Sequence, residues 1–234
     1  MLVSHDKKFI FLKTVKTAGT SVEVFFEEFC TSNSKHYELG EETRDAEVSS
    51  FGIVGARGGM KDLVRPIFFN HMPARELRDK LGSEVWREYF KFTVCRNPFD
   101  ALVSQFWFAN RDKNSEMLAQ TTVEIHSNFR KWLREPRDNP NSEIYLIDGV
   151  AAVDFFIRYE DLNEGVKFVC RHLGIQKDVS GLQNFKSGIR PKSAELAPIA
   201  PYYDRESIEI VELLYPYEIN TLGYSFQNVS KAPS

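Results

Sequence analysis

The chain has 234 residues, 42% of them hydrophobic and 13% aromatic, so it can bury the core of one large domain. A net charge of −3 argues against broad electrostatic binding to nucleic acid, although a local basic pocket fits within a balanced total. No apolar run approaches the ~20 residues of a membrane span, and the first residues lack the apolar core of a secretory signal. We therefore expect a soluble, cytoplasmic protein with a single domain over residues 1–234.

The cysteines and histidines carry little sign of cross-linking or metal binding. Cys30, Cys95 and Cys170 lie far apart in apolar contexts, which favours reduced, buried thiols over a disulfide framework. The five histidines form no cluster with metal-ligand spacing, either with one another or with the cysteines. We expect no structural metal.

The first predicted elements are a strand and a helix. The apolar run Phe9–Leu12 predicts a short strand buried on both faces. A helix is predicted from about Gly19, because apolar residues then follow at the i, i+3, i+4 and i+7 positions: Val22, Phe25, Phe26 and Phe29.

The turn between them, KTVKTAGTS, has the character of an anion site. The helix start would aim its backbone N–H groups and the positive end of its dipole at the turn. Side-chain donors are added by Lys16, Thr17, Thr20 and Ser21. The order of a Walker A loop is absent, since the lysine precedes the only glycine by three positions, so a nucleotide triphosphatase is disfavoured. The alternative is a plain turn whose hydroxyls cap the helix.

Residues 31–65 are rich in Ser, Glu, Gly and Arg and show no period, which predicts an irregular insertion. Such a segment either helps to receive a substrate or is a surface insertion. A second strand is predicted at Ile67–Phe69, followed by a helix from Pro73 through Leu81. His71 would then lie at the end of a strand, where open α/β sheets bind ligands. It is a candidate general base, and the alternative is a hydrogen-bonded structural histidine.

A third strand is predicted at Lys91–Cys95, directly before Arg96. Pro98 suits the first turn of a helix whose apolar face is formed by Phe99, Leu102, Val103 and Phe106. Arg96 could present a planar fork to a phosphate, and Ser104, two turns into the helix, could add a hydroxyl to the same group. The alternative for this pair is a salt-bridged arginine and a surface serine.

The second half of the chain is predicted to contain a long helix over residues 115–134, which ends in a basic stretch, Arg130–Arg137. Its cations could meet an anionic acceptor or form a solvated helix end. Strands at Ile144–Ile147 and Asp154–Tyr159 are predicted around an Asp148-Gly149 turn. A helix closed by Gly174 follows, with Val166, Val169, Cys170 and Leu173 on one face.

Three segments in this order, KTVKTAGTS, VCRNPFDALVSQF and IRYEDL, resemble the sulfotransferases, in particular the carbohydrate O-sulfotransferase branch. The likeness spans most of residues 8–226. The first segment is similar to that family's 5′-phosphosulfate loop and the second to its 3′-phosphate motif. His71, in FNHMPARELRDKL, matches the place of a histidine base in the uronyl 2-O-sulfotransferase branch, whereas other branches use a glutamate. Val15 departs from the pattern, which generally has proline there, so we expect a less rigid turn that loses no ligand.

The resemblance implies an α/β, P-loop-like three-layer fold with a central, mainly parallel sheet flanked by helices. It implies the donor 3′-phosphoadenosine 5′-phosphosulfate (PAPS), the product PAP and a hydroxyl-bearing acceptor, here a carbohydrate or small metabolite. Lys16 and His71 would be catalytic: Lys16 neutralises charge on the leaving bridging oxygen, and His71 takes the proton of the acceptor hydroxyl. The donor-binding residues would be Lys13, Lys16, Thr17, Ala18, Gly19, Thr20, Ser21, Arg96, Ser104, Lys186, Ser187 and Arg190.

No magnesium need be invoked, because a sulfuryl group carries less negative charge than a transferring phosphoryl group. Two alternatives stay open at this point. One is an ATP-dependent small-molecule kinase of related fold, and the other is a non-catalytic module that binds PAP.

Overall fold

The computed structural model describes residues 1–31, 44–58, 66–182 and 198–230. The chain forms two compact units, which we name the sheet unit (Met1–Cys95 with Pro140–Phe185) and the helical unit (Arg96–Asn139 with Lys186–Ser234). Each unit has its own hydrophobic core. That the two fold together as a single domain stays a prediction.

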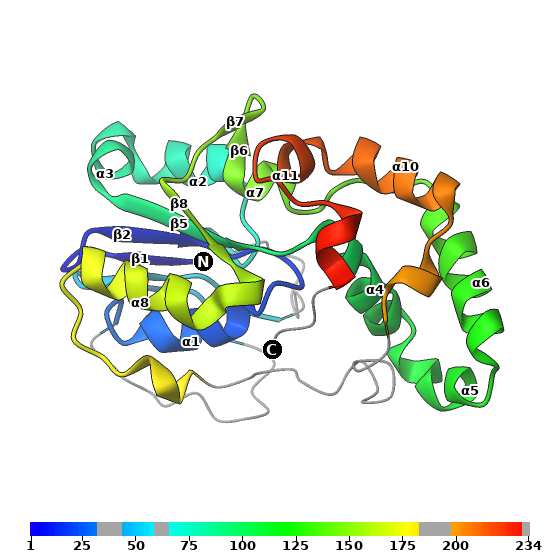
Figure 1. The fold of residues 1–234 in the computed structure, drawn as a ribbon. Helices are drawn as coiled ribbons and strands as arrows, with labels where there is room; N and C mark the ends of the chain where they lie inside the picture. The colour runs from blue at the N-terminus through cyan, green and yellow to red at the C-terminus, as the bar shows by residue number, and fades with distance from the viewer. Residues whose placement is uncertain (32–43, 59–65, 183–197, 231–234) are drawn as a thin grey trace. The chain divides into compact units, whose positions relative to one another are not determined.

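A six-stranded sheet in the order β3-β4-β1-β2-β5-β8 forms the centre of the sheet unit (Figure 1). Strand β5 (Phe90–Cys95) pairs in parallel with β2 (Phe9–Leu12) on one side and with β8 (Phe155–Arg158) on the other. The remaining strands extend the sheet in antiparallel fashion: β1 (Leu2–Ser4), β4 (Gly52–Val54) and β3 (Glu47–Val48). All of β2 is buried, as a strand covered on both faces requires.

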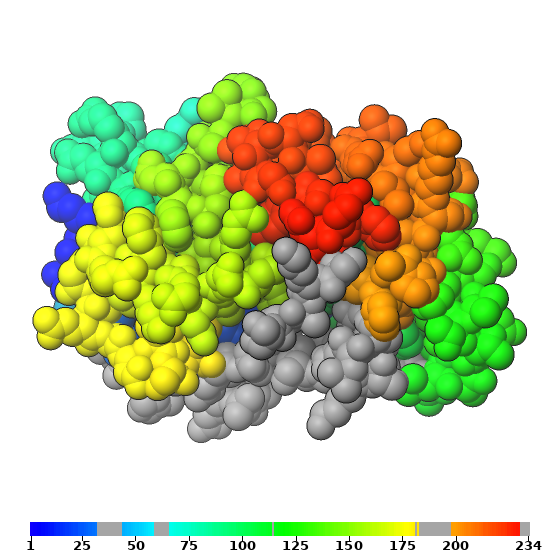
Figure 2. Space-filling view, in the orientation of Figure 1, coloured from blue at the N-terminus to red at the C-terminus, as the bar shows by residue number. Residues whose placement is uncertain are grey.

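Helices cover both faces of this sheet (Figure 1). On one face, α1 (Gly19–Glu27) and α8 (Leu162–His172) share a core with the strands, in which Phe26 and Val169 are packed with Phe92. On the other face lie α2 (Ala74–Leu81) and α3 (Ser83–Glu88). In the orientation of Figure 2, α8 lies in front of much of the sheet. The predicted α/β class, with parallel strands at its centre and flanking helices, is confirmed.

Most elements predicted for the sheet unit are confirmed. The strand at Phe9–Leu12, the helix start at Gly19 and the strand before Arg96 agree with the structure within one residue. Gly174 adopts φ 64° just after α8, which only a residue without a Cβ tolerates easily. The three cysteines are buried and free, as expected.

The strand predicted at Ile67–Phe69 is wrong. Phe69 forms only an isolated bridge with Ala56, and Ile67 is 68% exposed. Apolar composition favours a strand, but among the described residues this segment pairs only through that one bridge. His71 therefore follows a bend and not a strand.

Within the stretch predicted to be irregular, residues 44–58 contain β3 and β4. The strand β1, to which β4 pairs, was not predicted either. These strands are two or three residues long, too short to show a period of two.

The predicted turn at Asp148-Gly149 is confirmed. Both residues have positive φ, 54° and 77°, as the favoured two-residue hairpin turn requires. The turn joins β6 (Leu146–Ile147) to β7 (Val150–Ala151). The expected strand Ile144–Ile147 is only half correct, because its first two residues belong to the short helix α7 (Ser142–Tyr145).

The helical unit packs α4 (Pro98–Ala109) against other helices of the same unit around the rings of Phe99, Phe106 and Phe129. The helix predicted over residues 115–134 is two helices. The hydroxyl of Thr121 caps the Glu124 N–H, and the Glu124 carboxylate accepts from the Thr121 N–H, so a new helix starts here. The other helices of this unit are α5 (Asn114–Leu118), α6 (Thr122–Arg134), α10 (Arg205–Leu214) and α11 (Pro216–Asn220).

None of the helices that the structure describes is both long and apolar enough to cross a membrane.

Candidate functional site

The segment from Lys13 to Ala18, which we name the 13–18 loop, follows the carboxyl end of β2. Thr14 fixes it to the neighbouring strand, because its hydroxyl donates to the carbonyl of Val94 at 2.5 Å. Since that bond uses the Thr14 proton, the Thr17 hydroxyl donates to Thr14 Oγ1 at 2.6 Å. The loop therefore lies at the edge where parallel strands of α/β sheets bind ligands, and the Thr17 hydroxyl serves the loop itself.

The backbone of the 13–18 loop is held in an uncommon conformation. Lys16 has φ 61° and Ala18 has φ 58°, although neither is glycine. Each such residue costs about 1–3 kcal/mol, a strain that proteins concentrate at ligand sites. The left-handed Ala18 turns the chain into α1, and its carbonyl accepts the first helical bond, from Ser21 N at 3.0 Å. The positive end of the α1 dipole thus faces the loop.

Gly19 opens α1 because two chain segments approach closely there. A Cβ at this position would lie 2.8 Å from Lys13 Cγ and 3.1 Å from the Thr14 carbonyl oxygen. The absence of a side chain lets Lys13 pass beneath the helix start, where its ammonium pairs with Glu23 of α1 at 2.7 Å. Thr20 is half-buried and Ser21 is buried at the same helix start. Seven of the predicted donor-binding residues, 13 and 16–21, therefore form one continuous turn.

Glu23 is fully buried and surrounded by positive charge. Burial alone would raise the pKa of its carboxyl group. The charges of Lys13, the Met1 amino group and Arg57 outweigh burial and lower the pKa to about 2. Glu23 is thus ionised at neutral pH and holds Lys13 in place. One signal of this partner is visible in the sequence, a glutamate at the edge of the apolar face of the predicted helix.

His71 is joined to the 13–18 loop by a hydrogen bond. Its Nδ1 lies 2.9 Å from the carbonyl oxygen of Lys13, and since a carbonyl only accepts, Nδ1 carries the hydrogen. Desolvation of the ring, followed by the positive charge of Lys13, lowers the pKa of His71 to about 4. The residue as a whole is nevertheless exposed to solvent. The neutral imidazole thus keeps a lone pair on Nε2, and its backbone, with φ 61°, is also left-handed.

Among the described residues, five that are not glycine have positive φ, and three of them are Lys16, Ala18 and His71. The unfavourable backbone conformations of the chain therefore gather around one loop, which marks it as a site under functional constraint.

Val15, at the position where we expected a less rigid turn, is held by a side chain from far along the sequence. Its N–H donates to Oδ1 of Asn141 at 2.7 Å, and Nδ2 of Asn141 donates to the Val15 carbonyl at 3.2 Å. Sequence reasoning missed Asn141 and Thr14. Thr14 had a signal, a hydroxyl directly after a buried strand, whereas nothing in the sequence connects Asn141 with the loop.

In the helical unit, Arg96 directly precedes the N-cap of α4, and Ser104 lies in the middle of that helix. The Arg96 guanidinium is oriented by Asp100 in the first turn of α4, whose Oδ2 accepts from Nε at 2.6 Å. Asn97 caps α4 by accepting from the Phe99 N–H at 3.1 Å. Ser104 is half-buried, one turn after Asp100. The fork of Arg96 is thus preset by a carboxylate before any ligand binds.

The predicted donor-binding residues Lys186, Ser187 and Arg190 lie outside the described residues.

The basic stretch Arg130–Arg137 is engaged within the helical unit. Arg134 pairs with Asp204 at 2.9 Å and with Glu206 at 2.7 Å, and Arg130 lies 3.6 Å from Asp204. The Arg137 guanidinium lies 3.8 Å from the centre of the Trp132 ring. The three arginines of this stretch therefore meet protein groups.

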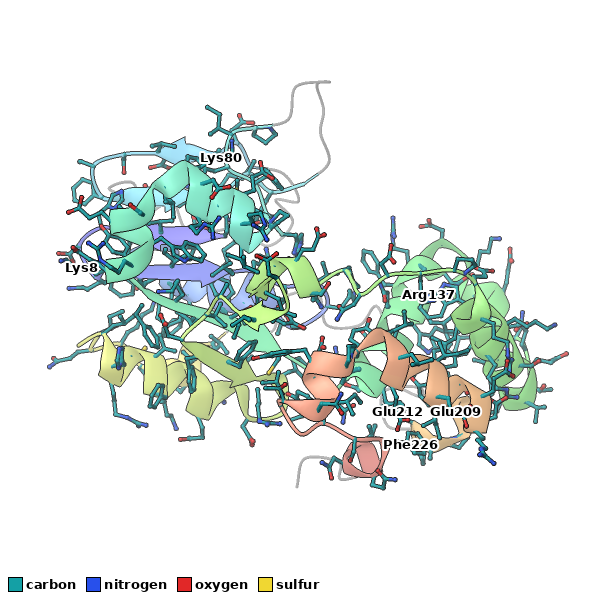
Figure 3. All side chains as sticks on the ribbon, turned by 90° about the horizontal axis from the view of Figure 1, so that it is seen from above. Lys8, Lys80, Arg137, Glu209, Glu212 and Phe226 are labelled. Carbon is teal, nitrogen blue, oxygen red and sulfur yellow. The ribbon has the colours of Figure 1, made fainter. Side chains whose placement is uncertain are left out.

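A pocket of about 610 Å³, with charged residues along most of its lining, lies beside α2 in the sheet unit. Its walls are α2 with the preceding Pro73, and the segment from α7 into β6. Two residues that are bound to the 13–18 loop each lie two positions before a wall residue: His71 before Pro73, and Asn141 before Glu143. Figure 3 labels Lys80, which α2 contributes to this pocket. Charged side chains of both signs form most of the lining: Arg75, Glu76, Asp79, Lys80, Glu143 and Asp148.

Comparison with known proteins assigns the chain to a family. A family described as "Sulfotransferase family" matches residues 1–225. The chain is also 28% identical to an "Uncharacterized protein" of Archaeoglobus fulgidus over 109 residues, which are 46% of this chain and 87% of that protein. No solved structure gives a significant match. Because the family match covers almost the whole chain, the protein belongs to the sulfotransferase family and is a PAPS-dependent sulfotransferase.

Proposed function

We propose that this enzyme transfers the sulfuryl group of PAPS to a hydroxyl of a carbohydrate or small metabolite, with His71 as the general base. The observation that carries the proposal is the hydrogen bond from His71 Nδ1 to the Lys13 carbonyl, 2.9 Å long. It joins a neutral imidazole to the loop that resembles a 5′-phosphosulfate loop. A base so placed has its second nitrogen available for an acceptor proton.

On the donor side, PAPS supplies the sulfuryl group. The backbone N–H groups at the start of α1, with the hydroxyls of Thr20 and Ser21, hold the 5′-phosphate in this proposal. Lys16 stabilises the charge that develops on the bridging oxygen. Lys13 supports the loop from within, because its buried ammonium is paired with Glu23 of α1.

The second phosphate distinguishes PAPS from ATP. We assign Arg96 and Ser104 to the 3′-phosphate, which suits a planar guanidinium fork. The bond from Arg96 to Asp100 supports this assignment, because a preset fork loses less freedom on binding. Lys186, Ser187 and Arg190 complete the donor site in the proposal.

The acceptor class follows from the base and from the pocket beside α2. A histidine at this position favours the uronyl 2-O-sulfotransferase-like branch of the carbohydrate enzymes. The pocket volume suits a ligand of one or a few rings, and its charged lining suits a molecule rich in hydroxyls. Pro73, two residues after His71, belongs to the pocket wall.

The first experiment is calorimetric titration of the protein with PAP, with 5′-AMP and with ATP plus magnesium. PAP should bind at least tenfold more tightly than 5′-AMP, because only PAP carries the 3′-phosphate. The Arg96→Ala variant should lose most of this preference. Acceptors are then screened with labelled PAPS, starting from hydroxyl-rich sugars.

Equal affinity for PAP and 5′-AMP would contradict the role of Arg96 and Ser104. A preference for ATP with magnesium would instead favour a small-molecule kinase. Tight PAP binding by an enzyme whose turnover survives loss of His71 would show that another group is the base.

A further inference from the structure

Asn141 holds both polar groups of one residue in the 13–18 loop. Its side-chain amide accepts from the Val15 N–H at 2.7 Å and donates to the Val15 carbonyl at 3.2 Å. The two residues lie 126 positions apart in the chain, both in the sheet unit. The amide of asparagine has one acceptor and two donor hydrogens, so this two-point contact matches its chemistry.

Val15 lies between two fixed points of the loop. Thr14, before it, is bound to the carbonyl of Val94, and Lys16, after it, has the unfavourable φ of 61°. A free valine backbone would allow the loop to relax from that strained state. The contact with Asn141 removes this freedom at Val15, between the anchored Thr14 and Lys16.

We propose that Asn141 is a positioning residue that keeps the 13–18 loop in its donor-binding shape through the backbone of Val15. This inference rests on the proposed function, in which the loop holds the 5′-phosphosulfate end of PAPS. Asn141 has no need to touch the donor for this role.

The support for Asn141 is itself rigid. Asn141 directly precedes α7, and its carbonyl accepts from the Ile144 N–H at 3.0 Å. Ile144 and Tyr145 of that helix are each 1% exposed. The helix also forms a wall of the pocket beside α2. The loop is thus braced against the same short helix that shapes the pocket.

Proline at position 15 offers a decisive test, because it restricts φ by its ring and has no N–H. Its Cδ would occupy the place of the hydrogen that now points to Asn141 Oδ1, well inside van der Waals contact. Proline at position 15 would therefore clash with the side chain of Asn141. With a small residue at position 141 the clash is absent, and the proline ring itself restricts the backbone of the loop. The expected pattern is one in which the double variant is better than either single variant.

The experiment measures the dissociation constant of PAP for the wild type, Asn141→Ala, Val15→Pro and the double variant. Asn141→Ala should weaken PAP binding about 5- to 100-fold, as loss of two hydrogen bonds predicts. Val15→Pro alone should also weaken it, and the double variant should return to within about threefold of the wild type. Asn128→Ala, which removes an amide that donates to Gln120 in the helical unit, is the matched control and should bind PAP normally.

Unchanged PAP affinity in Asn141→Ala would overturn the proposal, as would a double variant no better than Val15→Pro. If Asn141→Ala does not fold, Asn141→Asp replaces it, because it keeps the acceptor for Val15 and loses the donor. The melting temperatures of the four proteins, measured without PAP, show whether the contact between Asn141 and Val15 stabilises the protein. If the wild type fails to bind PAP but the double variant melts at a higher temperature than Val15→Pro, the donor assignment is contradicted and the contact between Asn141 and Val15 still stands.

Discussion

The imidazole of His71 lies beside the backbone of the 13–18 loop, and its environment sets its charge. Lys13 acts on it in two ways: the carbonyl fixes the hydrogen on Nδ1, and the nearby ammonium disfavours a second proton. Desolvation of the ring, followed by the positive charge of Lys13, lowers the pKa of His71 to about 4 from the ordinary value of 6.5, although the hydrogen bond to the Lys13 carbonyl acts in the opposite direction. At neutral pH the ring is therefore ready to accept a proton without first losing one.

Replacing His71 by Asn tests this role with little strain, because asparagine tolerates the left-handed backbone that His71 adopts. We expect the rate of sulfuryl transfer to fall by about 10²–10⁴-fold. PAP affinity should stay within about threefold of the wild type, since His71 is assigned to the acceptor proton and not to the donor. The measurements are transfer from labelled PAPS and calorimetric titration with PAP. A loss of PAP affinity equal to the loss of rate would argue for a structural histidine.

The pH dependence of the wild type gives a second readout. The unprotonated imidazole is the active form of the base. Activity is therefore present above the pKa of His71 and lost as the pH falls through about 4. The rate should thus stay level between about pH 8 and pH 5. An inflection near 6.5 would mean that Lys13 and burial do not act on the ring as described.

Single residues of the site differ in how well the sequence announces them. Lys16, Gly19 and Arg96 are visible because each follows a predicted strand within a few positions. Asn141 could not be found, since its partner lies 126 residues away and a hydrogen bond to backbone depends on no residue type in the loop. The sequence predicts what is local to a turn, and misses what the folded chain brings to it.

At the scale of elements, α1 has two buried sides with opposite chemistry. Val22, Phe25 and Phe26 pack into the core of the sheet. Glu23 and Glu27 face a buried set of cations, in which Glu27 pairs with Arg57 at 2.6 Å. The helix that ends the 13–18 loop is therefore held by apolar contacts on one side and by ion pairs on the other.

Glu23→Gln should destabilise the protein by about 3–5 kcal/mol, because it leaves buried Lys13 without its compensating charge. The stabilisation is present above pH 4.5 and is lost as the pH falls toward 2, so the two proteins should converge in acid. Urea unfolding from pH 7 to pH 3 measures the difference. Glu164→Gln, which breaks an exposed pair with Lys167, is the control and should unfold like the wild type. Equal stability of Glu23→Gln and the control would contradict the burial of this pair.

The elements that sequence analysis missed share a physical reason. The strands β1, β3 and β4 are two or three residues long and gain their stability from each other and from β2, not from their own composition. Ile67–Phe69 shows the reverse, since its apolar residues find only one bridge. The break in the predicted helix at 115–134 was encoded locally by Thr121 and Glu124, and could have been found from the capping pattern.

At the scale of the whole molecule, charge limits which acceptors the enzyme attracts. The net charge is −3, and the basic stretch at Arg130–Arg137 is neutralised in part by Asp204 and Glu206. No broad positive surface is expected to draw a polyanion over long distances. This agrees with the compact hydroxylated acceptor that we propose.

We expect the protein to elute from immobilised heparin below about 0.15 M salt, where screening of exposed charges is already strong. Asp204→Asn should raise that salt concentration, because it removes one negative charge that faces Arg130 and Arg134, while asparagine keeps the cap of α10. Retention of the wild type at high salt, unchanged in Asp204→Asn, would show that another surface binds polyanions.

The three buried cysteines have a practical consequence for following this enzyme at work. They are all the cysteines of the chain, and none is more than 5% exposed. A maleimide dye added to the folded protein would therefore find few native targets. Val150, 69% exposed in the hairpin that continues from the pocket wall, is a suitable place for one new thiol. A fluorophore attached there would test whether the acceptor binds in the pocket, by a change in its emission, with the donor loop chemically untouched.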